Sequence, residues 1–167
     1  RALDTRIAIN KGDLPSFDDE SMALFGSTAP VYDASHFEAI LAELDALLPG
    51  NGPLGERVEA CNNQFAIPLD KLPPVFEAAM AECRQRTLEH IELPEGESFT
   101  IEYVNDKPWS GYNWYQGGAV SLIQVNTDFP IYISRAVDLG CHEGYPGHHT
   151  FNALLEKNLV NDEGWIE

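Results

Sequence analysis

The sequence is poor in basic residues and has no long apolar run. Ten lysines and arginines stand against 27 aspartates and glutamates, which gives a formal net charge of −17. Nucleic-acid binding depends on lysine and arginine displacing counterions from the phosphate backbone, so no nucleic acid is expected as a partner. No apolar stretch approaches the roughly 20 residues that a membrane-spanning helix needs. The sequence therefore predicts no membrane segment either.

Cysteine is also scarce. The three cysteines, Cys61, Cys83 and Cys141, form no CxxC pair, and an odd number without such spacing does not indicate a disulfide scaffold. Cys61 and Cys83 fall in helical patterns, where a thiol commonly packs as a small buried hydrophobe. Cys141 precedes a histidine, but adjacent helical positions point about 100° apart, which favours packing over metal ligation. The cellular compartment stays open.

An initiator methionine and the layout of a signal peptide are both missing at the start of the chain. The last residue, Glu167, follows an apolar-periodic stretch with no closing turn. With 167 residues, 44% of them hydrophobic, the chain is long enough to bury a core. We interpret residues 1–167 as a single domain, an incomplete fragment of a larger one.

Helical periodicity dominates residues 1–93. Residues 1–30 predict two short helices around a turn, and a capping box of Ser35 and Glu38 predicts the start of a third, whose apolar residues recur from 37 to 48. Residues 54–65 and 72–91 predict two further helices, the second with an apolar stripe that we assign to the core.

Residues 97–127 have the pattern of strands instead. Residues 98–104 alternate apolar and polar side chains, and residues 119–127 predict a second strand. The loop between them is rich in glycine and aromatic residues, which either cover the sheet or line a pocket: Trp109, Tyr112, Trp114 and Tyr115.

A last helix is predicted over residues 134–160, with Ser134 as its N-cap. The fold class that follows is α+β, predominantly helical, with a small sheet beside this helix.

Three of the five histidines lie in the segment HEGYPGHH at 142–149 of this last helix. Zinc hydrolases commonly present two imidazoles four residues apart on one helix, with a glutamate directly after the first acting as general base. His142 and Glu143 match the first half of this pattern. The position of the second histidine is taken by Pro146, however, and His148 arrives two residues late.

A regular helix would place His148 some 120° away from the face of His142. Pro146 cannot donate a hydrogen bond to the carbonyl of His142, and Gly147 tolerates unusual dihedral angles, so a local bulge could return His148 toward His142. His149 regains the face of His142, but about 10.5 Å further along the axis, which is too far for one metal. We therefore rank His148 above His149 as the second ligand.

The segment HEGYPGHH, preceded by QVNT and SRAVDLGC, resembles the motif of the DUF885 family, bacterial gluzincin-like metallopeptidases with an HExxPGH signature. An FDDESMALFG-like start and a long helix before the strand also suit that family. The resemblance implies a gluzincin-like fold, a Zn²⁺ cofactor, His142 and His148 as metal ligands and Glu143 as catalytic base. His149 is then a neighbour that orients substrate or a ligand.

The resemblance also implies a third ligand, a glutamate on a later helix in an EGW-like setting. Glu163 stands in such a setting, but only 15 residues after His148, so the alternative is a residue beyond Glu167. The family further implies a strand whose unpaired backbone groups pair with an extended peptide. Residues 121–127 are the candidate, with Asn126 either serving in the cleft or forming a turn.

These features predict a zinc-dependent hydrolase, in the first place a metallopeptidase with a peptide substrate. Zinc would polarise the scissile carbonyl and lower the pKa of its bound water toward about 7, and Glu143 would take the proton. Two alternatives stay open: a non-peptide amidohydrolase that uses the same site, and an inactive fragment or helical module whose histidines cap and pack a helix end. Peptide specificity, endo- or exo-action and oligomeric state are not fixed by the sequence.

Overall fold

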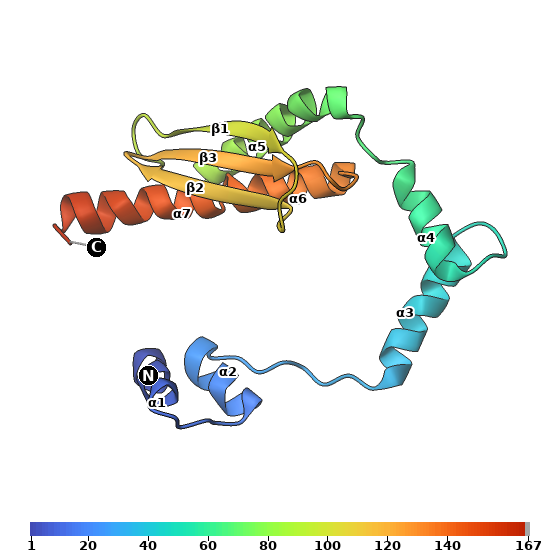
Figure 1. Ribbon diagram of the computed structural model, residues 1–167, viewed down its shortest axis with the longest axis horizontal. Helices are drawn as coiled ribbons and strands as arrows, with labels where there is room; N and C mark the ends of the chain where they lie inside the picture. Colours follow the sequence, from blue (N-terminus) through green and yellow to red (C-terminus); the bar gives the residue numbers. More distant parts are fainter. Residues whose placement is uncertain (166–167) are drawn as a thin grey trace. The chain divides into compact units, whose positions relative to one another are not determined.

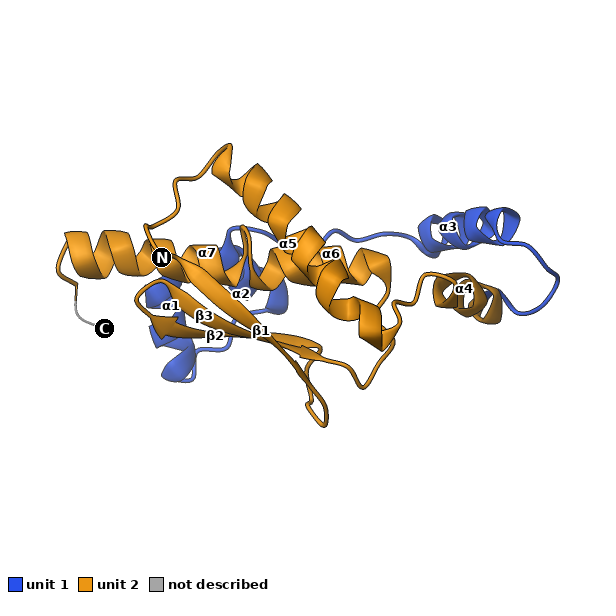
Figure 2. Cartoon of the chain, turned by 90° about the horizontal axis from the view of Figure 1, so that it is seen from above, with its two compact units in different colours: residues 1–54 blue, residues 55–167 orange. Residues whose placement is uncertain are grey.

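The computed structural model describes residues 1–165, and the chain divides into two compact units, Arg1–Leu54 and Gly55–Glu167 (Figure 2). The sequence was interpreted as a single domain, whereas contacts between residues divide the chain into these two units. The fold is α+β, about 53% helical with a small three-stranded sheet, which confirms the predicted class. Within residues 1–165, no helix combines the length and apolar character needed to cross a membrane.

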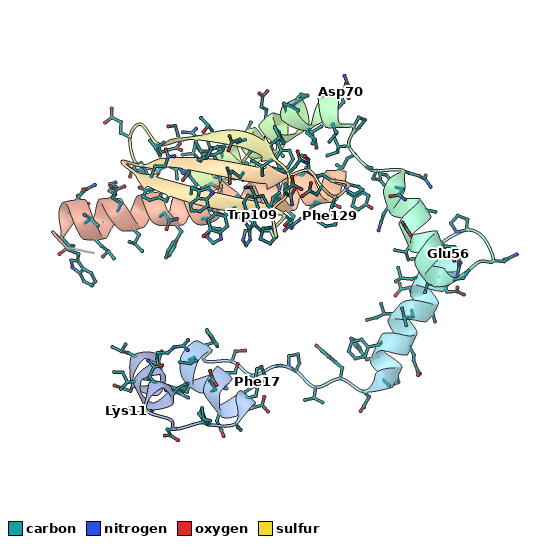
Figure 3. All side chains as sticks on the ribbon, in the orientation of Figure 1. Lys11, Phe17, Glu56, Asp70, Trp109 and Phe129 are labelled. Atoms are coloured by element: carbon teal, nitrogen blue, oxygen red, sulfur yellow. A yellow bond between two sulfur atoms is a disulfide. The ribbon has the colours of Figure 1, made fainter. Side chains whose placement is uncertain are left out.

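The first unit contains three helices, α1 (Ala2–Asn10), α2 (Phe17–Phe25) and α3 (Ala34–Leu47) (Figure 1). Helices α1 and α2 contact each other, which confirms two short helices around a turn. The hydroxyl of Ser16 caps α2 by accepting a hydrogen bond of 3.2 Å from the N–H of Asp19. Phe17, the first residue of α2, is exposed (Figure 3).

Helix α3 begins one residue before the predicted capping box. Its N-cap is Asp33, without a side-chain capping bond, and Ser35 lies inside the first turn, so the predicted box of Ser35 and Glu38 is wrong. The apolar periodicity predicted the helix correctly, but its apolar face stays between 38% and 73% exposed: Phe37, Ile40, Leu41, Leu44 and Leu47.

The second unit starts with two helices, α4 (Leu54–Asn63) and α5 (Leu72–Leu88), where they were predicted. A single 3₁₀ turn, η1 (Leu69–Lys71), leads into α5, and prolines occupy the first turn of α5, where a missing N–H costs nothing. The apolar stripe of α5 is buried through Leu72, Phe76 and Met80, as expected.

The sheet has three strands, β1 (Ser98–Val104), β2 (Gly111–Gly117) and β3 (Val120–Asn126), in the order β1-β3-β2. β3 pairs in parallel with β1 and antiparallel with β2. The first and last strands were predicted, but the aromatic segment between them was wrongly taken as a loop. Its residues alternate between exposed and half-buried along β2, which is the period of two that a strand requires.

The core lies between one face of the sheet and the helices α5 and α6 (Ile133–Glu143) (Figure 1). α6 begins after Tyr132, so Ser134 is not its N-cap. The predicted helix over 134–160 is interrupted after Glu143, resumes as α7 (His148–Leu155) and continues as the π-helical segment η2 (Glu156–Asp162). Residues of β3, of the facing helices and of the segments that precede η1 and α6 form the core cluster: Ile67, Leu72, Phe76, Met80, Ile123, Val125, Ile131, Ala136 and Leu139.

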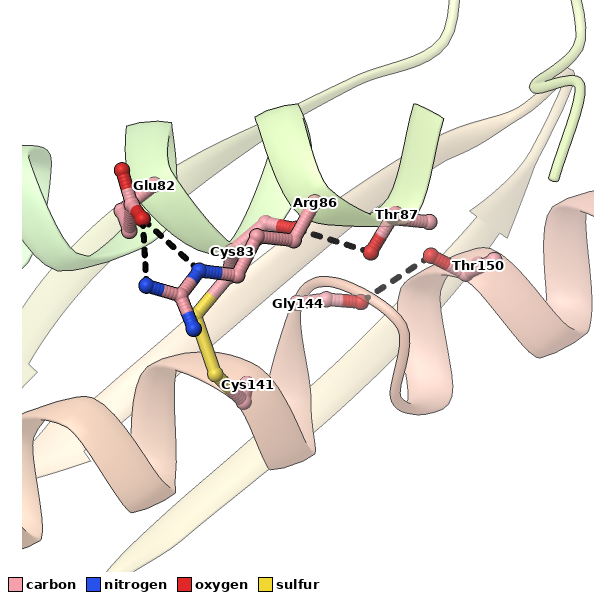
Figure 4. Close-up of a disulfide and its surroundings, with 7 residues drawn as sticks. All are labelled: Glu82, Cys83, Arg86, Thr87, Cys141, Gly144 and Thr150. Carbon is pink, nitrogen blue, oxygen red and sulfur yellow. Dashed lines mark hydrogen bonds and ion pairs between the residues drawn. A yellow bond between two sulfur atoms is a disulfide. The ribbon is translucent and has the colours of Figure 1, made fainter. Parts of the chain in front are cut away.

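A disulfide between Cys83 and Cys141 ties α5 to α6 (Figure 4). The expectation of packed free thiols at these two positions is therefore wrong. The two cysteines are 58 residues apart and meet only because their helices pack together, which no spacing rule detects. Closing a loop of this length restricts the unfolded chain and stabilises the fold by about 4 kcal/mol. Cys141 directly precedes His142, so the disulfide anchors α6 to α5 next to this histidine.

Candidate metal centre

The segment HEGYPGHH forms the connection between α6 and α7. α6 ends at Glu143, the Tyr145–Pro146 peptide bond is cis, and Gly147 is the N-cap of α7. The N–H of Gly147 donates to the carbonyl of Cys141 at 3.0 Å, which folds the connection back onto the end of α6. The predicted bulge at Pro-Gly is thus a full break between two helices.

This break brings His142 and His148 together. Their ring centres lie 4.8 Å apart, with the ring planes at 86°, and both side chains are exposed. Two imidazoles on one tetrahedral zinc, each nitrogen at about 2.1 Å from the metal, have ring centres about 5 Å apart. The separation of the two rings therefore suits a shared metal ion.

Glu143 lies between these histidines in sequence but is buried, with 4% of its surface exposed. Its Oε2 atom is buried and has no hydrogen-bond partner among residues 1–165. Burial raises the pKa of Glu143, while the charges of His148, His142 and Arg135 act in the opposite direction. A buried carboxylate next to two imidazoles, with one oxygen that the described residues leave unpartnered, is an arrangement found at sites that move protons.

Strand β2 is attached to the end of α6 through Asn113. Its side-chain amide donates to the carbonyl of Glu143 at 2.8 Å, and its Oδ1 atom is buried with no partner in the part of the chain that the structure describes. At the other end of β2, the hydroxyl of Tyr115 donates to the carboxylate of Glu156 on η2. The strand therefore runs alongside both motif helices. Asn113 was not predicted as a site residue, because the segment that forms β2 was interpreted as a loop.

Within the described residues, β2 has an unpaired edge in this sheet, whereas β3 has none. β3 is paired on both sides, so residues 121–127 cannot take an added strand, and this prediction is wrong. Asn126 makes a turn: its amide donates to the carbonyls of Lys107 and Trp109 at 3.0 and 2.9 Å. Ser110 and Asn126 lie opposite each other, and the N–H of Asn126 donates to the carbonyl of Ser110, so they form a hydrogen-bonded pair. Hydrogen-bonded and non-hydrogen-bonded pairs alternate along two antiparallel strands. Asn113, three residues after Ser110, therefore forms a non-hydrogen-bonded pair with Ile123. The backbone N–H and C=O of Asn113 consequently point away from β3.

His149 is not part of the exposed pair. It is fully buried: its Nδ1 lies 2.9 Å from the hydroxyl of Ser121 on β3, and its Nε2 lies 3.0 Å from Oε2 of Glu97. Glu97 also receives hydrogen bonds from Tyr145 and Arg84. These contacts hold the start of α7 against the sheet. His149 therefore helps to position the neighbouring His148, and its burial keeps it from contacting a substrate.

The order Ser121, His149, Glu97 has the contacts of a serine-hydrolase triad, but its burial excludes that use. The hydroxyl of Ser121 belongs to a side chain with 1% exposure, and the imidazole of His149 has none. A nucleophile must reach the substrate carbonyl to attack it. We therefore assign these contacts a structural role, not a catalytic one.

Glu97 makes the stability of this region sensitive to acid. Burial raises its pKa, but the hydrogen bonds from Tyr145, His149 and Arg84 outweigh burial and hold its pKa below the ordinary 4.5. A lowered folded-state pKa gives stability that is present above the unfolded value and is lost as the pH falls through the folded one. Hydrogen bonds to charged groups contribute about 1.5–3 kcal/mol, so Glu97→Gln is expected to lower the unfolding free energy at pH 7 by about 2–3 kcal/mol.

Urea unfolding of both proteins between pH 7 and pH 3 checks this expectation. The gap between wild type and Glu97→Gln should narrow below about pH 4.5, because the wild type loses the same interactions there. Glu82→Gln is the matched control, since Glu82 pairs with Arg86 at the surface with 55% of its side chain exposed. A constant gap over the whole range would show that the ionised carboxylate of Glu97 carries no stability.

Glu163 lies away from the histidine pair. It follows η2, is exposed, and stands 15 residues beyond His148 along a continuous helical stretch, which corresponds to roughly 20 Å. Within residues 1–165, no group of three or more histidine, cysteine, aspartate or glutamate side chains gathers as a metal-binding cluster. The described residues thus bring together two imidazoles and one buried carboxylate.

Comparison of the chain with protein-family models, curated proteins and solved structures finds no match.

Proposed function

We propose that this chain carries the metal-binding and general-base residues of a zinc-dependent metallopeptidase. The proposed enzyme resembles the DUF885 family, and through that family it is related to the gluzincins. The observation that carries the proposal is the meeting of the exposed His142 and His148 rings, 4.8 Å apart, beside the buried carboxylate of Glu143, whose Oε2 atom has no partner among the described residues. Zinc hydrolases use this set of groups: imidazole ligands and a glutamate that is not itself required as a ligand.

His142 and His148 would hold the metal through one nitrogen each, since both imidazoles are exposed and share one side of the α6–α7 connection. When bound, zinc polarises a scissile carbonyl and lowers the pKa of a water molecule toward about 7. Glu143 would accept the proton of the attacking water at Oε2 and later deliver it to the leaving amine. The third protein ligand is a residue other than Glu163, given the distance along α7 and η2.

Strand β2 would hold the substrate. An extended peptide can add to the free edge of β2 at Asn113, because the backbone groups of this residue point out of the sheet. The hydrogen bond from Asn113 to the carbonyl of Glu143 fixes this edge beside the proposed base. Backbone pairing of this kind favours a peptide over a small amide, which ranks the peptidase above the amidohydrolase.

Zinc binding tests the proposal. Equilibrium dialysis against micromolar zinc, with metal content measured by elemental mass spectrometry, is expected to give one zinc per wild-type chain. His142→Ala and His148→Ala should each weaken binding more than about 100-fold, because loss of a ligand costs at least as much as loss of its supporting shell. His90→Ala is the matched control, as His90 is exposed and lies after the end of α5.

Each alternative predicts a different result. A helical module whose histidines only cap and pack would bind no zinc in wild type, or would bind it equally well in all three variants, and either result would refute the metal centre. An amidohydrolase would bind zinc at His142 and His148 but cleave small acyl amides and leave peptides intact. Cleavage of a quenched fluorescent peptide that zinc chelation abolishes is the outcome that the metallopeptidase requires.

A further inference from the structure

The face of β2 that looks away from the helices carries a row of aromatic side chains. Asn113 and Tyr115 point toward the motif helices, where they bond Glu143 and Glu156, so the alternating Tyr112 and Trp114 lie on the opposite face. Their side chains are 43% and 50% exposed. Trp109, in the loop that leads into β2 (Figure 3), contacts the ring of Tyr112 and so continues the row.

Contacts with the rest of the sheet fix the rings of this row. The centre of the Tyr112 ring lies 5.7 Å from that of Trp109 and 4.7 Å from that of Trp114. The indole N–H of Trp114 donates to Oε1 of Gln124 at 3.0 Å, and the amide of Gln124 donates to Glu102 at 2.6 Å. An indole anchored by its edge keeps a ring face open to solvent, so the row is a preformed platform rather than a set of loose side chains.

The surroundings of the platform are acidic. Residues 98–128 contain three carboxylates, Glu102, Asp106 and Asp128, and one basic residue, Lys107. Arg135 of α6 donates to the hydroxyl of Ser110, and its charge is paired with that of Asp138. Hydrogen bonds hold the pKa of Asp128 below its ordinary value, and the bond from the side-chain amide of Asn105 has the largest effect. The whole chain has a formal charge of −17. A cationic partner is therefore attracted to this face, and aromatic rings add cation–π attraction, which is strongest for a planar guanidinium.

We propose that β2 binds an extended peptide whose arginine side chains lie against Tyr112 and Trp114. The inference rests on the proposed function, since it names the class of peptide that would be the substrate. Residues paired across a sheet share a face, so a peptide residue opposite Asn113 points toward the helices. Its two neighbours, opposite Tyr112 and Trp114, point toward the rings. Arginines two positions apart therefore fit the platform together.

A binding experiment tests this inference without any catalysis. Fluorescein-labelled, capped pentapeptides of alanine carry arginine, norleucine or glutamate at both the second and the fourth position, and fluorescence anisotropy measures their dissociation constants in the presence of a zinc chelator. The arginine peptide is expected to bind wild type about tenfold more tightly than the norleucine peptide, from two cation–π contacts of about 2–5-fold each. The glutamate peptide should bind most weakly.

Variants of the platform separate the rings from general charge attraction. Trp114→Ala and Tyr112→Ala should each reduce the arginine preference about 2–5-fold, while Tyr112→Phe keeps it, because a phenyl ring retains the quadrupole. Phe25→Ala on α2 is the matched control, an exposed aromatic residue in the other unit, and should leave the preference unchanged.

Two results would overturn the inference: equal binding of the arginine and norleucine peptides, or an arginine preference that survives both alanine variants and therefore comes from net charge alone. The chelator keeps this outcome separate from the metal centre. Loss of the arginine preference leaves zinc binding at His142 and His148 untouched, and failure of zinc binding leaves the peptide titration measurable.

Discussion

Glu143→Gln is expected to lower kcat/KM for peptide cleavage by about 10²–10⁴, the usual contribution of a positioned general base. The amide keeps the shape of the side chain but cannot accept a proton at the buried position of Oε2. Zinc affinity should stay within about twofold of wild type, because Glu143 is assigned no ligand role. Activity and metal content are measured on the same preparations, the first with quenched fluorescent peptides and the second by equilibrium dialysis.

Comparison with His148→Ala separates the role of a general base from the role of a metal ligand. His148→Ala should lose zinc and activity together, whereas Glu143→Gln should lose activity alone. Glu82→Gln, on the surface of α5, controls for the loss of one carboxylate from an acidic chain. Cleavage at the wild-type rate by Glu143→Gln would remove the general-base role, and loss of zinc from this variant would make Glu143 a ligand instead of a base.

The approach of His142 to His148 could be predicted from the sequence, whereas much of the surrounding structure could not. His142, Glu143 and His148 lie in one short motif, so local chemistry alone was enough to propose them as candidate site residues, and the role of Pro146 and Gly147 in breaking the helix followed from their backbone properties. The form of the break differed from the expected bulge, because the chain leaves α6 entirely and starts α7 at His148.

What the sequence did not predict depends on contacts between distant segments. The disulfide joins two cysteines that are 58 residues apart, and the cluster around His149 includes Glu97, the residue before β1, and Ser121 of β3. The edge position of β2 follows from the strand order, which places β3 between its neighbours. The alternation within GYNWYQG did carry a strand signal, but its glycines and aromatic residues favoured a loop by composition.

The pairing of the two histidines also depends on one glycine. A Cβ atom added to Gly147 would lie 1.7 Å from the carbonyl oxygen of His142 and 2.5 Å from that of Cys141. Both are backbone atoms at the end of α6, so no side-chain rotation relieves the clash. The N–H of Gly147 also donates to the carbonyl of Cys141, and the disulfide of Cys141 holds that turn against α5. The connection can therefore accommodate a side chain at this position only by opening.

Gly147→Ala is accordingly expected to destabilise the second unit by more than about 3 kcal/mol and to abolish stoichiometric zinc binding, because an open connection separates His148 from His142. Gly55→Ala is the matched control: it has no atom within 4 Å of the added carbon, lies inside α4, and should be neutral or slightly stabilising. Urea unfolding followed by circular dichroism gives the stability, and dialysis gives the metal content. Equal stability and zinc content in the two variants would mean that close backbone contact at Gly147 does not hold the histidines together, and the centre would then have to form through another arrangement of the α6–α7 connection.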